Sequence, residues 1–139
     1  MNTNQQFSVA IHVLTLLAAR PEKALTSEQI AGSVNTHPVV IRRVMGHLRA
    51  HGLVESRPGA AGGWKLAQTP EQIRLCSVYD AFSHEELLGM HRHPSEDCPI
   101  GSRIRPALAK VFGCAERAMH DSLSGFTVAD VLREVTSDE

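Results

Sequence analysis

The sequence predicts a mainly α protein that carries one small β-hairpin and continues into a long helix near its end. Three observations support this fold class. Apolar residues recur at helical spacing before residue 52, a Gly/Pro-rich link joins two alternating segments between residues 53 and 67, and a long helical pattern follows residue 103. With 139 residues, 42% of them hydrophobic and 21% charged, the chain has room for one globular domain with an extension, which excludes most multi-domain enzymes.

An amphipathic helix and a second, short helix are predicted before residue 36. Apolar residues repeat at three- and four-residue spacing over 5–19, and Arg20-Pro21 ends this helix. Thr26 then offers an N-cap, with Gln29 three positions later completing a capping box. The second helix stops near Asn35.

The third predicted helix begins at Pro38 and ends at His51-Gly52, where a glycine allows the chain to turn. At 100° per residue, one arc faces the core and the other faces away from it. The core arc holds Ile41, Val44, Met45 and Leu48; the opposite arc holds Val39, Arg43, Gly46 and Ala50, flanked by Arg42 and His47. Two adjacent arginines are therefore expected to project outward. The small residues Gly46 and Ala50 on the same side would let the helix approach another surface closely. The alternative is an ordinary surface helix that its arginines keep soluble.

A hairpin follows the third helix. The segments 53–57 and 64–67 alternate in polarity and flank the link 58–63. Three helices and then a hairpin are the order of a winged helix-turn-helix, in which the third helix enters the DNA major groove, about 12 Å wide, and the hairpin lies along the backbone or minor groove. Arg57 and Lys65 are expected beside the tip, as phosphate contacts.

Charge is distributed unevenly along the chain. The formal net charge is -1, but segment 36–67 has five basic residues against the single acid Glu55, a local +4, and also contains three histidines. From residue 127 the balance is -3, with Asp138 and Glu139 among the acids. This pattern indicates a face that meets an anion, with an ordinary solvated surface as the alternative.

The second half of the chain is expected to contain a short helix before residue 82, an irregular loop over 83–102 and a long helix over 103–124. The long helix, roughly 30 Å at 1.5 Å per residue, has two apolar strips. We expect one strip to cover the first domain and the other to meet a two-fold related copy of the chain. Thr127 and Asp130 cap a last short helix. The predicted organisation is a DNA-binding domain at 1–82, a loop at 83–102, and a dimerisation helix with a C-terminal helix at 103–139.

Several stretches resemble the Rrf2 family of bacterial transcriptional regulators. They are Phe7-Ser8-Val9-Ala10-Ile11-His12, Pro38-Val39-Val40-Ile41-Arg42-Arg43, His51-Gly52-Leu53-Val54, Gly59-Ala60-Ala61-Gly62-Gly63-Trp64 and Cys98-Pro99-Ile100-Gly101. The likeness covers nearly the whole chain. The predicted hairpin is the wing of this fold, and its Ala60 and Ala61 stand where glycine is common in the family. Trp64 stands where the family tends to carry tyrosine.

The resemblance implies a homodimer that binds a roughly palindromic operator on double-stranded DNA, with the long helix as the dimer interface. Carried over residue by residue, DNA contacts would come from Thr36, His37, Val39, Val40, Arg42 and Arg43, and wing contacts from Arg57, Gly62 and Gly63. We therefore interpret the chain as a sequence-specific regulator, and as a repressor. A winged helix used only for protein contacts is the alternative. No phosphate loop, nucleophile elbow or catalytic carboxylate pair is present, so an enzyme is not expected.

The resemblance also points to an iron-sulfur cluster as a cofactor. Members of the family often hold one through three closely spaced cysteines in the loop before the long helix. This loop has only Cys98, and Cys76 and Cys114 lie in apolar surroundings that predict buried thiols. His12 matches a position that completes some clusters, but Ser8 stands where a carboxylate is wanted. We expect no cofactor, with a cluster-carrying redox sensor as the alternative.

Cys98 is also a candidate redox thiol, because a helical turn after Pro99 would favour the thiolate through its dipole. Glu96 and Asp97 oppose this effect, and an unreactive loop cysteine is the alternative. His84, His91 and His93 with Cys98 do not have a recognised zinc spacing, so we expect solvated histidines and no metal.

The sequence suggests a cytoplasmic protein without a membrane partner. The longest apolar stretch, 9–19, is too short to span a bilayer, and the polar start lacks the basic region of a signal peptide. Three scattered cysteines favour a reducing compartment over an extracellular disulfide framework.

Overall fold

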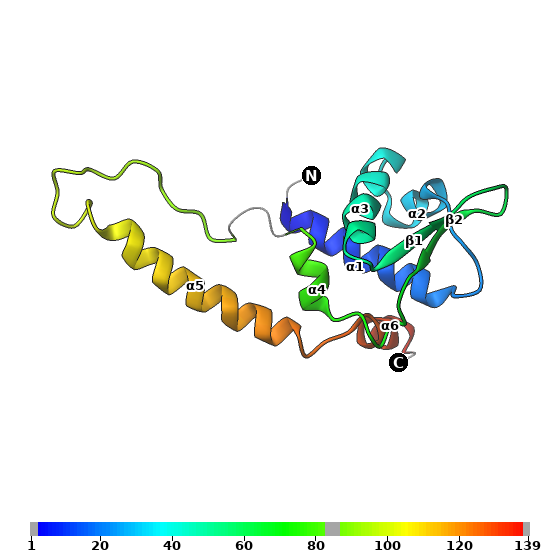
Figure 1. Ribbon diagram of the computed structural model, residues 1–139. Helices are drawn as coiled ribbons and strands as arrows, with labels where there is room; N and C mark the ends of the chain where they lie inside the picture. Colours follow the sequence, from blue (N-terminus) through cyan, green and yellow to red (C-terminus); the bar gives the residue numbers. More distant parts are fainter. Residues whose placement is uncertain (1–2, 83–86, 138–139) are drawn as a thin grey trace.

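The structure is a computed structural model that describes residues 3–82 and 87–137. Within these ranges it is mainly helical with one two-stranded antiparallel hairpin, which confirms the predicted fold class (Figure 1). The elements in chain order are α1 (Thr3–Ala19), α2 (Ser27–Val34), α3 (Pro38–Ala50), β1 (Val54–Arg57), β2 (Gly63–Leu66), α4 (Leu75–Asp80), α5 (Ile104–Leu123) and α6 (Val128–Thr136). Among the described residues, no helix is long and apolar enough to cross a membrane.

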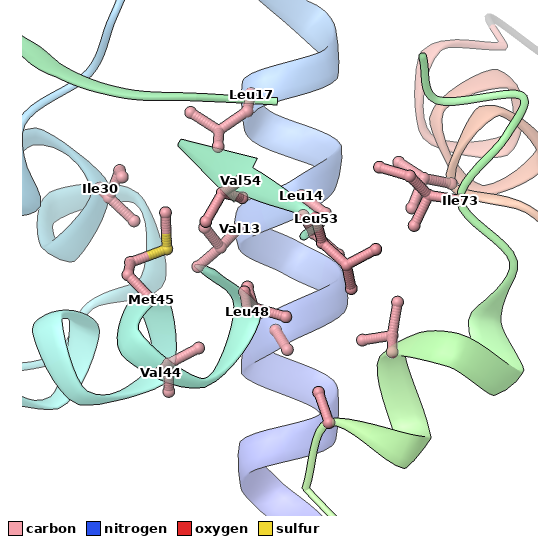
Figure 2. Packing of buried hydrophobic residues seen from close by; sticks show 14 of the residues in the cluster. Val13, Leu14, Leu17, Ile30, Val44, Met45, Leu48, Leu53, Val54 and Ile73 are labelled. Atoms are coloured by element: carbon pink, nitrogen blue, oxygen red, sulfur yellow. The ribbon is translucent and has the colours of Figure 1, made fainter. Parts of the chain in front are cut away.

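The core lies where α1 meets α2, α3 and the hairpin (Figure 2). Apolar side chains repeat along one side of each of these helices. The helices bury these sides by packing them against one another in a common core. Among the fully buried side chains are Val13, Leu14, Ile30, Ile41, Val44, Met45 and Leu48. These contacts set the angle at which α3 lies against α1, and therefore which side of α3 meets solvent.

Local sequence signals set the boundaries of α2 and α3. The Thr26 side chain accepts a hydrogen bond from the Gln29 N–H, and the Gln29 side chain accepts one from the Thr26 N–H, which confirms the predicted capping box. Asn35 ends α2 with φ +62°, a left-handed conformation that asparagine tolerates. Pro38 then opens α3, where its missing N–H removes no helical hydrogen bond.

The hairpin is joined to the helices by a further backbone pairing. Its register places Val54 opposite Leu66 and Arg57 opposite Gly63. Leu25, just before α2, forms an antiparallel bridge with Trp64: the Leu25 N–H donates to the Trp64 carbonyl at 3.1 Å, and the Trp64 N–H donates to the Leu25 carbonyl at 2.7 Å. The wing is therefore held by β2 against the segment that leads into α2.

The chain returns to the first domain after α5. The Val128 N–H donates to the Ile73 carbonyl at 2.9 Å, both side chains are fully buried, and α6 packs along α1. A bridge between Arg74 and Thr127 lies beside them. Thr127 and Asp130 form the expected capping box of α6. The C-terminal helix thus lies beside the N-terminal one.

The long helix α5 projects away from the rest of the molecule (Figure 1) and contains no buried residue. The expectation that one of its strips covers the first domain is wrong. Among the described residues, its last turns are the part that reaches the domain: His120 pairs with Asp80 of α4 at 3.0 Å, and Leu123 packs against the core. The reason is the direction of α5: a helix anchored at one end cannot bring its distant turns onto the domain.

The same geometry corrects the predicted burial of one cysteine. Cys76 is buried as predicted, but Cys114 is exposed, because α5 is not covered by its own chain. The predictions that concern His84 and the acids Asp138 and Glu139 lie outside the described residues.

Candidate nucleic-acid interface

The outward side of α3 is the centre of the candidate interface. Ile41, Val44, Met45 and Leu48 are all 0% exposed, which confirms the predicted core arc. On the opposite side Val39, Arg42, Arg43, Gly46 and Ala50 are all exposed. Val39 is 47% exposed, so an apolar group stands beside two cations at the start of the helix. Such a surface can contact both phosphates and the apolar edge of a thymine.

The start of α3 is shaped by His37. Its side chain caps the helix, since Nδ1 accepts a hydrogen bond from the Val39 N–H at 3.1 Å. A ring that accepts at Nδ1 carries its proton on Nε2, so the exposed edge of His37 can donate. Thr36 and Val40 are half-buried, and the Thr36 N–H donates to the Ala31 carbonyl at 3.1 Å. These three residues and the outward side of α3 are brought together at one end of the helix.

The two arginines of α3 have different surroundings. Arg42 Nη2 donates to Glu28 Oε2 of α2 at 2.6 Å, and the two side chains are 54% and 63% exposed. Arg43 is exposed and, within the part of the chain that the structure describes, takes part in no ion pair. Sequence reasoning missed Glu28, because its pairing with a residue fourteen positions away depends on how α2 crosses α3.

The wing carries a second arginine–carboxylate pair. Arg57 donates to Glu55 Oε1 from Nη2 at 2.9 Å and from Nε at 3.3 Å. Because side chains alternate along a strand and Lys65 lies opposite Glu55, these three residues share one face of the hairpin. Arg57 lies at the base of the tip, as predicted, whereas Lys65 lies two residue pairs further from the tip and is half-buried.

Gly62 and Gly63 have a structural task in the wing. Gly63 adopts φ +144°, and a Cβ there would approach the Leu25 carbonyl oxygen to 2.5 Å. A Cβ on Gly62 would collide with the backbone of Arg57 and Gly59. Both glycines are half-buried. Gly63 allows the hairpin to approach the backbone at Leu25, and Gly62 allows the tight turn of the hairpin itself.

Trp64 connects the wing to the helix-turn-helix. Its Nε1 donates to Ser27 Oγ at 3.2 Å, and the Arg49 guanidinium of α3 lies 6.0 Å from its ring centroid. The indole therefore contacts elements on both sides of the α2–α3 turn. This arrangement fixes the wing and α3 relative to each other.

Cys98 lies in an exposed turn before α5. Hydrogen bonds from the backbone of Gly101, and then of Ile100, lower the pKa of its thiol, because N–H dipoles stabilise the thiolate. The turn is closed by the Ser102 N–H, which donates to the Cys98 carbonyl at 2.9 Å. A Cβ at Gly101 would lie 2.5 Å from the Ser95 carbonyl oxygen, so this turn needs glycine.

The comparison with known proteins decides the family. The Rrf2 family, described as iron-dependent transcriptional regulators, matches residues 3–134. The chain belongs to the Rrf2 family. It is therefore a DNA-binding transcriptional regulator, and this family and the relatives of the chain are regulators rather than enzymes.

Individual relatives of this Rrf2 protein are also described as regulators or DNA-binding proteins. A Bacillus subtilis (strain 168) protein named as an HTH-type transcriptional regulator, YwnA, is 38% identical over 133 residues, covering 95% of this chain and 98% of its own. A solved chain described as a DNA binding protein is 35% identical with a TM-score of 0.75, covering 91% of this chain and 98% of its own. A solved chain from Lactobacillus plantarum, described as a transcriptional regulator, is 26% identical with a TM-score of 0.79, covering 94% of this chain and 89% of its own.

The cysteines of this chain are far apart for the iron that the family description names. Cys76 is buried in α4, Cys114 lies in the middle of α5, and Cys98 is the one cysteine of the loop. Outside the undescribed positions, which include His84, no group of three or more His, Cys, Asp or Glu residues is placed to hold a metal ion. A cluster bound by three thiolates of one chain does not fit this arrangement.

Substituting Gly63 tests the wing geometry. We expect Gly63→Ala to lower the free energy of unfolding by about 1–3 kcal/mol, because the left-handed backbone and the contact with Leu25 both oppose a Cβ. The control is Gly32→Ala in α2, where a Cβ meets nothing within 4 Å. There alanine should raise the free energy of unfolding by about 0.5–1 kcal/mol, because it restricts the unfolded chain more than glycine does. Urea denaturation measures both, and equal effects would contradict the close approach.

Alkylation tests the Cys98 turn. In a Cys114→Ser variant, the rate of reaction with iodoacetamide should reach half its maximum at a pH below about 8.5, the ordinary value for a cysteine thiol, because the turn lowers the pKa of Cys98. The thiolate fraction, and with it the rate, then remains high at a pH where free cysteine is protonated. A midpoint at or above that of free cysteine would show that the two N–H groups do not stabilise the thiolate.

Proposed function

We propose that this protein is a repressor that binds a palindromic operator as a homodimer, with α3 in the major groove and the wing along the DNA backbone. The observation that carries the proposal is the two-sided character of α3. Its four core residues are fully buried, while Arg42, Arg43 and Val39 face outward together. Thr36, His37 and Val40 at the same end, and Arg57, Gly62, Gly63 and Lys65 on the wing, complete the proposed contact set.

The proposed dimer is supported by α5. Five apolar residues of this helix fall within one arc, and none of them is buried by its own chain: Ile104, Leu108, Val111, Phe112 and Ala115. Val111 is 61% exposed. Solvent exposure of so much apolar surface is unfavourable, and a second copy of the same helix covers it with the same residues.

A two-fold dimer accounts for the proposed palindrome. Two copies of α3 related by this symmetry would meet two half-sites of opposite orientation, about 34–36 Å apart or a multiple of it. Selection of bound fragments from genomic DNA tests this proposal. Enriched fragments should share an inverted repeat, and transcription from a promoter that contains it should fall when the protein is added. Enrichment without symmetry would contradict the dimer, and a rise in transcription would contradict repression.

Redox control through Cys98 is a second candidate function, favoured by the exposed thiol and the N–H groups that lower its pKa. With hydrogen peroxide, the thiolate sulfur would attack one oxygen, the O–O bond would break and hydroxide would leave, giving a sulfenic acid. Operator affinity measured before and after peroxide treatment, in wild type and Cys98→Ser, tests it. An identical loss in both proteins would exclude Cys98.

Removing the unpaired arginine tests the role of α3. Arg43→Ala should weaken binding to the selected duplex, and the slope of log affinity against log salt should fall by about one unit if one phosphate contact is lost. Affinity is measured at several salt concentrations. An unchanged affinity and slope would favour a winged helix used only for protein contacts.

A charge on α5 tests the dimer. Val111→Glu should dissociate the proposed dimer, because it places a carboxylate in the apolar interface, and operator binding should weaken with it. Sedimentation measures the mass. Lys110→Gln is the matched control, since it makes the same change in net charge at an exposed position on the other side of α5. A Val111→Glu protein with the wild-type mass would contradict this interface.

A further inference from the structure

Glu28 lies among the proposed DNA contacts although it carries the charge that DNA repels. It occupies the first turn of α2, and its carboxylate bridges to Arg42 of α3 at 2.6 Å. The pair therefore links the two helices of the helix-turn-helix across their outer surface. Both side chains are more than half exposed.

This pair contributes little to folding, because exposed ion pairs are screened by water and salt. It nevertheless restricts the Arg42 side chain. An arginine has five N–H donors in a planar fork, and the contact with Glu28 uses one of its terminal nitrogens. Donors remain for a guanine edge, which arginine contacts through two parallel hydrogen bonds. An arginine that is already ordered loses less conformational entropy when it makes them.

Glu28 has the opposite effect on phosphate binding. Non-specific affinity comes from neutralising phosphates, and a carboxylate beside Arg42 cancels part of its charge. Arg43, on the same face, takes part in no ion pair within the described part of the chain and keeps its full charge for the backbone. The two neighbouring arginines therefore differ: Arg42 is oriented and partly neutralised by Glu28, whereas Arg43 is not.

We infer that Glu28 is a specificity-determining residue, which positions Arg42 toward a base edge and reduces its attraction for phosphates. This inference rests on the proposed function, since it requires α3 in the major groove. Glu28 acts through Arg42, so its effect on sequence discrimination should depend on that residue.

The experiment compares two duplexes of equal length and composition, one recovered by the genomic selection and one scrambled. Glu28→Gln should bind the scrambled duplex more tightly, with a salt slope steeper by up to about one unit. The ratio of selected to scrambled affinity should fall by about tenfold, within the discrimination that one bidentate contact supplies. Thermal melting of each variant confirms that it is folded.

Further variants separate charge from position. Glu28→Asp keeps the charge on a shorter side chain, so the scrambled affinity should stay at the wild-type value while the ratio still falls. In an Arg42→Ala background Glu28→Gln should leave the ratio unchanged, whereas in an Arg43→Ala background it should lower the ratio as before. Glu134→Gln, an exposed acid on α6, is the charge-matched control and should change neither quantity.

The possible failures are distinguishable. If the wild-type protein binds both duplexes equally, the proposed function fails and the inference fails with it. If the wild-type protein discriminates but Glu28→Gln keeps the full ratio, the inference alone is overturned. A fall in the ratio that persists without Arg42 would also overturn it, because Glu28 would then act by another route.

Discussion

The fold depends on the one-sided burial of α3. Four of its side chains are completely enclosed, each contributing about 1.5–3 kcal/mol to folding. Because rotating the helix would expose these side chains, the outward direction of Arg42 and Arg43 is held by the core rather than by any contact of their own. The outward surface of α3, which we propose meets DNA, is thus set by the packing of the core.

Three consecutive residues at the start of α2 connect the parts of the proposed interface. Thr26 caps α2, Ser27 accepts a hydrogen bond from the Trp64 indole of the wing, and Glu28 pairs with Arg42 of α3. Leu25, immediately before them, forms the bridge to β2. The helix-turn-helix and the wing therefore form one unit, and a change at this short segment would move both surfaces that DNA is proposed to meet.

The second half of the chain is organised differently. Helix α6 returns to pack on α1, and within residues 3–82 and 87–137 α5 meets the first domain at its C-terminal end, through the pair between His120 and Asp80 and through Leu123. Nearby, burial, then Glu116 and Asp80, raise the pKa of Tyr79, whose ring packs edge-on against Phe7 of α1. These contacts place the end of α5 against α4 and, through the Tyr79 ring, next to α1.

The sequence by itself determined the helices, the capping boxes of α2 and α6 and the two sides of α3, because helical period and capping depend on neighbours within a few residues. It also identified the family through short stretches such as 38–43 and 59–64. Only the tertiary structure decided that Glu28 meets Arg42, that Gly63 packs against Leu25, and that α5 with Cys114 stands uncovered by its own chain. Such pairings join residues far apart in the chain, so they depend on how whole elements cross, which local spacing does not encode.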